Sequence, residues 1–265
     1  MAMDLPQKNY AWATEIEIDT LNRILKKIFR HRCNNSDITS NCTHCMKELS
    51  DWLPSSYKDT GFIVECDLTF SKEARDRLKF YPPFPSHKEI NYTDLSIFNK
   101  MNAKENMKSS KLVFSLENKK NQVININYCM LLCKLGVMVE IKNAVSFFQS
   151  KFLTSWIEMC SSARAQAALI GDTCAVKFTK LVVNSIYGKF LENQIGRCIY
   201  KVITDRQKQM NIFRDPLLKT FSAISPITVI AQLKKAEIEI TRPTPIGLSI
   251  LDNSKMIMTS FFTVF

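Results

Sequence analysis

Glycine is scarce in this sequence, with six residues among 265. That is about 2%, against the ~7% that is usual in proteins. Neither G-x-G-x-x-G nor G-x-x-x-x-G-K-[ST] occurs, and these are the glycine-rich loops that bind dinucleotides or nucleotide phosphates. The sequence therefore argues against a Rossmann or P-loop enzyme. Hydrophobic residues make up 46% and charged residues 23%, which are ordinary values for a globular protein.

Long apolar runs are missing as well. The longest one, Tyr128–Val139, is interrupted by Lys134, whereas a membrane span needs about 20 apolar residues. Residues 1–10 lack the apolar stretch of a signal peptide. Nine cysteines, an odd number, without such a signal indicate free thiols in a reducing compartment. We therefore expect a soluble protein inside the cell, with the nucleus as one compatible compartment and no membrane partner.

Acidic residues are fewer than basic ones, 25 against 36, which gives a formal net charge of +11. The excess lies mostly in the second part of the chain. Residues 1–150 hold 21 basic and 17 acidic residues, whereas residues 151–265 hold 15 and 8. Such a surface suits a polyanionic partner. An ordinary solvated basic surface explains the charge equally well, so charge alone does not identify a partner.

Hydrophobic periodicity predicts both strands and helices. The β-branched stretch Gly61–Thr69 predicts a strand, and Tyr128–Gly136 predicts a short helix that ends at Gly136. Residues 157–193 predict a long helical region interrupted at Gly171-Asp172, with Asp172 as the N-cap of the second helix. The other expectations are two strands in Lys111–Ile126, a strand in Ala236–Thr241 and a helical or mixed segment over residues 246–262.

The densest chemical signal lies in the second of these helices, in the segment Lys177–Asn193. Four of its residues occur at i, i+4, i+7 and i+8 and share one helical face: Lys180, Asn184, Tyr187 and Gly188. The cation suits phosphate groups, the ring suits stacking on a base or sugar, and the glycine allows a planar ligand to approach the backbone. The alternative is an ordinary amphipathic helix with an incidental asparagine and glycine.

The pattern K-x-x-x-N-S-x-Y-G, here Lys180 to Gly188, resembles the second polymerase motif of family B DNA polymerases in their protein-primed branch. The chain is similar over nearly its whole length to the replicases of Polinton-type mobile elements and related viruses. Four further stretches in the expected order carry this resemblance: Gly61–Phe70 followed by Tyr81-Pro82, Asn121–Ile141, Phe148–Ile157, and Pro245 to Phe261.

The resemblance implies an α+β chain with a partial right-handed polymerase fold, made of palm pieces, helical fingers and β-rich insertions. Residues 1–60 would be a palm-associated segment with a Cys/His-containing insertion, and residues 61–150 an insertion that faces a terminal priming protein. Residues 151–196 would form the fingers and residues 197–243 a β-rich insertion on the template side. Residues 244–265 would be a palm helix that stops before the third motif, so we expect an internal part of a larger enzyme.

The implied activity is DNA-directed DNA polymerisation, a nucleotidyl transfer in DNA replication. The implied partners are a DNA template–primer, a deoxynucleoside triphosphate (dNTP) and a terminal priming protein. Lys180 would contact the phosphates of the dNTP, Tyr187 would lie under its sugar, and Gly188 would pass close to the nascent base pair. Asn184 would also line the nucleotide pocket. The residues expected to contact DNA are Ser185, Lys189 and Arg164.

The family holds two metal ions, Mg²⁺ in the full-length enzyme, with carboxylates from motifs that resemble D-x-x-x-L-Y and D-T-D-S. Neither motif occurs in this sequence, so we assign no catalytic residue. Asp67 stands on a predicted strand, and we interpret it as an acidic residue at a strand edge and not as a substitute ligand. We therefore expect that this chain alone does not polymerise DNA.

A cluster near the N-terminus contains candidate zinc ligands: His31, Cys33, Cys42, His44 and Cys45. Cys42 and Cys45 have the C-x-x-C spacing of half a structural site. A second such pair is missing, so we favour a surface loop with reduced thiols over a zinc site. The alternative function is a basic nucleic-acid-binding module, with a possible zinc site and without catalysis.

Overall fold

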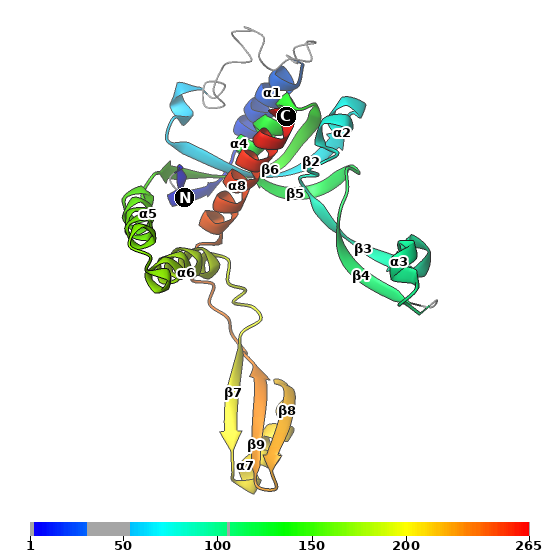
Figure 1. The fold of residues 1–265 in the computed structure, drawn as a ribbon, viewed down its shortest axis with the longest axis vertical. Coiled ribbons are helices and arrows are strands. Elements are labelled where there is room, and N and C mark those ends of the chain that lie inside the picture. The colour runs from blue at the N-terminus through cyan, green and yellow to red at the C-terminus, as the bar shows by residue number, and fades with distance from the viewer. Residues whose placement is uncertain (1–2, 31–53, 105–106, 265) are drawn as a thin grey trace.

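A computed structural model of the chain describes residues 3–30, 54–104 and 107–264. The protein is mixed α+β, and its main sheet is antiparallel and curled into a half-barrel (Figure 1). The strands of this sheet, in order across it, are β1 (Leu5–Trp12), β6 (Val137–Ser150), β2 (Thr60–Phe70) and β5 (Lys119–Asn125). The predicted α+β class is confirmed, whereas the polymerase fold stays a prediction.

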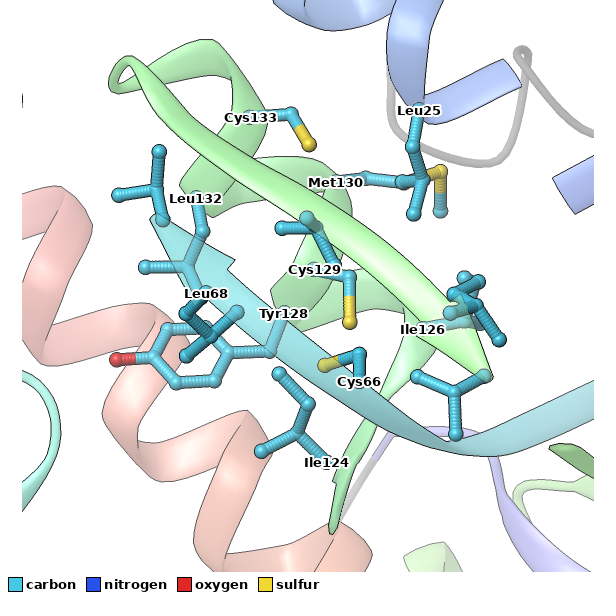
Figure 2. Close-up of a cluster of buried hydrophobic side chains, with 14 of the residues drawn as sticks. Leu25, Cys66, Leu68, Ile124, Ile126, Tyr128, Cys129, Met130, Leu132 and Cys133 are labelled. Atoms are coloured by element: carbon cyan, nitrogen blue, oxygen red, sulfur yellow. The ribbon is translucent and has the colours of Figure 1, made fainter. Parts of the chain in front are cut away.

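The main core lies between this sheet and three helices, α1 (Glu15–Arg30), α4 (Ile126–Lys134) and α8 (Thr244–Val264) (Figure 1). Alternate side chains of β2 point into the core because side chains alternate across a strand: Phe62, Val64, Cys66 and Leu68 are buried. Figure 2 shows some of them beside side chains of α4, with Leu25 of α1 across the core. The predicted strand over Gly61–Thr69 is therefore confirmed.

Helix α4 is capped at its N-terminus by Asn125 and is followed by the predicted Gly136. Asn125 is the N-cap, and its side chain accepts a hydrogen bond of 3.0 Å from the Asn127 N–H. Gly136 follows the last turn with φ of +93°, a conformation that residues with a Cβ rarely adopt. The helix predicted from Tyr128 to Gly136 is confirmed, although it starts two residues earlier.

Polar side chains join α8 to α4 inside the core. Asp252 is fully buried and accepts a hydrogen bond of 2.8 Å from the Asn125 N–H. The Asn125 side chain donates to Ser249 Oγ at 3.3 Å. One turn further into α4, the hydroxyl oxygens of Tyr128 and Thr259 lie 3.2 Å apart. These contacts hold α8 in a defined register on α4, because each polar group is satisfied only in that register.

A two-stranded arm and small helices surround the half-barrel. The arm consists of β3 (Pro85–Asn91) and β4 (Lys108–Phe114), with the short helices η3 (Tyr92–Asp94) and α3 (Ile97–Lys100) between them, and projects to one side (Figure 1). Elsewhere in the described ranges, η2 (Ser55–Tyr57) and α2 (Lys72–Leu78) are also short helices.

The rest of the chain forms a helix pair and a separate small sheet. The pair is α5 (Thr154–Leu169) and α6 (Thr173–Phe190). The small sheet has the order β7 (Cys198–Ile203), β9 (Thr228–Lys234) and β8 (Leu218–Ser225), and α7 (Arg206–Phe213) follows β7 in the chain. We call residues 198–234 the distal unit, because Figure 1 shows it far from the half-barrel at the end of two extended segments. It has its own small core around Ile203, Ala231 and Leu233.

Some predictions from periodicity are confirmed and others are wrong. The helix break at Gly171-Asp172 is confirmed, since the Asp172 side chain accepts a hydrogen bond of 2.9 Å from the Ala175 N–H. The helix over residues 246–262 is also confirmed as part of α8. The strand in Ala236–Thr241 is wrong: this segment has no strand partner and is a linker. Two strands do occur in Lys111–Ile126, but each pairs with a different strand and not with the other.

None of the helices in the described ranges combines the length and apolar character that a bilayer-spanning segment requires.

Candidate functional site

The four residues predicted to bind a nucleotide lie on one face of helix α6, as their spacing in the sequence predicts. Lys180, Asn184 and Gly188 are exposed, whereas Tyr187 is half-buried at the border of the same face. Helix α6 packs against α5, and Cys160 and Ala167 of α5 are buried. In Figure 1, α6 lies between the half-barrel and the distal unit, and α5 lies to its left at the side of the half-barrel. The structure therefore brings the four residues to one accessible helix face.

Gly188 lies on this face without any packing reason to be a glycine. A Cβ placed on it would meet no atom of the described residues within 4 Å, and its backbone is helical. Gly247, at the start of α8, is the opposite case, because a Cβ there would lie 2.6 Å from the Leu191 side chain. The space beside Gly188 is thus open to solvent, and a flat ligand can approach the α6 backbone there.

The Tyr187 ring is half-buried, and its hydroxyl stays protonated at neutral pH. Partial burial raises the pKa of Tyr187 above its ordinary value of 10.0. At neutral pH the side chain is therefore a neutral ring with one polar end. Such a ring can pack against a sugar or base without placing negative charge beside phosphate groups.

The residues predicted to contact DNA have different surroundings. Ser185 donates its hydroxyl hydrogen to the Leu181 carbonyl oxygen at 2.7 Å, and Lys189 forms an ion pair of 3.2 Å with Glu192. Arg164 is exposed on α5. Lys180 lies on α6, so the two cations belong to separate helices of the pair.

The Glu192 carboxylate lies close to three basic side chains, two from nearby positions and one that is distant in the sequence. Arg197 donates to it through Nε at 3.0 Å and forms an ion pair through Nη2 at 2.7 Å, and Lys189 lies at 3.2 Å. The Arg242 Nε lies 3.7 Å away. Hydrogen bonds from Arg197 and then Lys189 lower the pKa of the Glu192 carboxyl. Arg242 is 50 positions away in the chain, and only the fold brings it here.

Asp67 lies on an interior strand, so its interpretation as a strand-edge residue is wrong. β2 is paired on both sides, with β5 and β6. The Asp67 carboxylate forms an ion pair of 2.8 Å with Lys142 and accepts a hydrogen bond of 2.8 Å from the Asn121 N–H. The contact with Lys142, and then that with Asn121, lowers the pKa of Asp67. Its oxygens are therefore already engaged within the sheet.

The candidate zinc ligands His31, Cys33, Cys42, His44 and Cys45 lie outside the described residues. Within the described ranges, no three histidine, cysteine, aspartate or glutamate side chains are grouped so that they could hold a metal ion. The six cysteines in these ranges are free thiols. Three of them are buried in the main core and visible in Figure 2: Cys66, Cys129 and Cys133. Burial raises the pKa of Cys133 to about 12, which makes it a poor nucleophile.

Comparison with family models, with curated proteins and with solved structures found no match to this chain.

Proposed function

We propose that this chain is part of a DNA-directed DNA polymerase of the protein-primed family B branch. In this proposal it binds a DNA template–primer and an incoming dNTP and contributes to nucleotidyl transfer during DNA replication. The observation that carries the proposal is the exposed face of α6, with Lys180, Asn184 and the open position at Gly188 beside Tyr187. These four residues are also those that resemble the polymerase motif.

Each group on this face has a role that its chemistry permits. The Lys180 ammonium contacts the negatively charged triphosphate, and the neutral Tyr187 ring lies under the sugar. Asn184 lines the nucleotide pocket with an amide that both donates and accepts hydrogen bonds. Gly188 leaves room for the nascent base pair. Ser185, Lys189 and Arg164 contact the DNA, and a terminal priming protein is the further partner.

The described residues do not fit a pair of catalytic Mg²⁺ ions. Such a pair needs several carboxylates directed at one point, and no such group occurs among the residues that the structure describes. Asp67 is engaged by Lys142, and Asp252 is buried against α4. No catalytic step is therefore assigned to these residues, and we propose that the chain alone does not extend a primer.

Nucleotide binding tests the α6 face directly. Fluorescence anisotropy would follow a labelled template–primer with the protein, with and without the dNTP that pairs with the template. We expect the dNTP to tighten binding, and Lys180→Ala to weaken this nucleotide-dependent step roughly tenfold, because a hydrogen bond to a charged group contributes about 1.5 kcal/mol or more. Lys26→Ala, which removes an exposed lysine from α1, is the matched control and should change nothing.

The result separates the two candidate functions. Equal effects of Lys180→Ala and Lys26→Ala would exclude α6 as the nucleotide site. Salt-sensitive DNA binding without any nucleotide effect would instead support the nucleic-acid-binding module without catalysis. Primer extension with Mg²⁺ tests activity separately: incorporation that depends on Lys180 would contradict our expectation that the chain alone is inactive.

A further inference from the structure

The distal unit is joined to the rest of the molecule by two chain segments. Residues 191–197 connect α6 to β7, and residues 235–243 connect β9 to α8; together we call them the neck (Figure 1). The two segments do not pair as strands with each other. The distal core around Ala231 is also separate from the main core. The position of the distal unit therefore depends on contacts within the neck.

Gln194 joins the two segments of the neck through its side chain. It is only 6% exposed, whereas its neighbour Ile195 is 69% exposed. Its amide oxygen accepts hydrogen bonds from the backbone N–H groups of Thr241 at 3.0 Å and Arg242 at 3.1 Å. Its amide nitrogen donates to Thr241 Oγ1 at 3.1 Å. The oxygen uses both of its acceptor positions, so this amide replaces the backbone pairing that the neck lacks.

Charged groups add a second connection beside Gln194. Glu192 of the first segment forms a two-point contact with Arg197 and lies 3.7 Å from Arg242 of the second segment. Lys189, at the end of α6, approaches the same carboxylate at 3.2 Å. The Glu192 carboxylate thus accepts hydrogen bonds from cations of α6 and of the first neck segment, and it forms a longer ion pair with Arg242 of the second segment.

The base of the neck is packed against α8. Gly247 in the first turn of α8 lies so close to Leu191 that a Cβ would come within 2.6 Å of that side chain and 3.2 Å of Phe190 Cβ. The α6 end of the neck is therefore fixed to the half-barrel, and the Gln194 and Glu192 contacts act between this fixed base and the distal unit.

We propose that Gln194 and Glu192 form a latch that holds the two neck segments together and fixes the orientation of the distal unit relative to α6 and α8. Opening the latch releases the distal unit to change its orientation while the half-barrel stays folded. The distal unit carries six basic and two acidic residues, so the latch also fixes where this positive charge lies. The inference does not depend on the proposed function.

Hydrogen–deuterium exchange and small-angle X-ray scattering together test the latch on the full chain. Gln194→Leu keeps the size of the side chain and removes its hydrogen bonds. We expect roughly tenfold faster exchange at the Thr241 and Arg242 amides, as follows from losing a partly buried hydrogen bond to each. We also expect a broader distribution of interatomic distances in solution. Gln194→Glu keeps the two acceptor positions and should restore slow exchange.

The control variant is Gln166→Leu, which changes an exposed glutamine of α5 and should leave both measurements unchanged. Unchanged exchange at Thr241 and Arg242 in Gln194→Leu would overturn the latch. An unchanged distance distribution would overturn it too, because the orientation would then be held elsewhere. If Gln194→Leu also speeds exchange at the amides of β2 and β6, the Gln194 contacts stabilise the whole fold. The proposal of a local latch would then be wrong.

Discussion

Two helix glycines, Gly188 and Gly247, have opposite surroundings. A Cβ at Gly188 of α6 meets nothing within 4 Å, whereas a Cβ at Gly247 of α8 would lie 2.6 Å from Leu191. Glycine is required at Gly247 because two chain segments approach closely there. At Gly188 no contact within the described chain requires it, which leaves an external ligand as the reason that our proposal offers.

Adding a side chain at these two positions should therefore affect the free energy of unfolding differently. Gly247→Val should lower the free energy of unfolding by about 1–3 kcal/mol, because the added atoms overpack the contact with Leu191. Gly188→Ala should be neutral or raise it by up to about 1 kcal/mol, because alanine favours helix more than glycine does. Urea unfolding followed by circular dichroism measures both, and a stable Gly247→Val variant would contradict the close approach.

Single residues also show how far the candidate site can be predicted. Lys180, Asn184 and Gly188 share a face because the helical repeat is local, so their spacing alone predicts it. The contact of Glu192 with Arg242 joins positions 50 residues apart, and no local pattern encodes it. Lys189 was predicted to contact DNA, and the structure shows that its charge also serves the pair with Glu192.

At the scale of elements, α8 and α4 are joined through a buried carboxyl group. Burial raises the pKa of Asp252, and this effect outweighs the opposing contacts with Lys255 and the Asn125 N–H. In the folded protein Asp252 therefore binds a proton at a higher pH than in the unfolded chain, where its pKa is about 3.9. Its contribution to stability is fully present below that pH and is lost as the pH rises through the folded pKa.

Asp252→Asn removes this pH dependence. The asparagine oxygen can still accept the Asn125 N–H, and the side chain cannot ionise. Between about pH 4 and about pH 7, we expect the original chain to lose more unfolding free energy than the variant, or to gain less. Only the original chain must ionise a buried acid over this interval. Urea unfolding at the two pH values measures the difference. Identical pH dependences would show that Asp252 is not desolvated as the structure indicates.

Two segments show why periodicity predicts some elements and misses others. Ala236–Thr241 alternates as a strand does, yet it is a linker, because none of the strands in the described ranges pairs with it. β1 has only two buried residues at its start and six exposed ones, so its sequence has little periodic signal. It is a strand because it pairs with β6, which is far from it in the sequence. Strand pairing depends on partners that a local pattern does not show.

At the scale of the molecule, the half-barrel and the distal unit have separate cores. The half-barrel core includes residues of α1, α4 and the main sheet, whereas the distal core has three buried residues and two partly buried neighbours. A unit of fewer than about 40 residues rarely buries enough apolar surface to be stable alone. The distal unit should therefore open more easily than the main sheet.

Replacing residues 198–234 by a short glycine-rich turn tests this separation. Cys198 and Lys234 are paired neighbours, so a short turn can connect the chain without strain. We expect the unfolding free energy of the half-barrel to stay within about 0.5 kcal/mol, because sites without shared contacts contribute independently. Urea unfolding followed by near-ultraviolet circular dichroism measures it. A loss of several kcal/mol would mean that the distal unit contributes to the main core.

Four features can be predicted from the amino-acid sequence: the α+β class, the helix pair with its break at Asp172, the shared face of α6 and the glycine that follows α4. Each of these follows from interactions within a few residues: side-chain periodicity, N-capping and the backbone freedom of glycine. The tertiary structure alone decided that Asp67 lies on an interior strand, that Asp252 is buried against α4 and that Gln194 and Glu192 bind across the neck. These features join residues separated by tens of positions, and their energies exist only once the chain has brought those residues into contact.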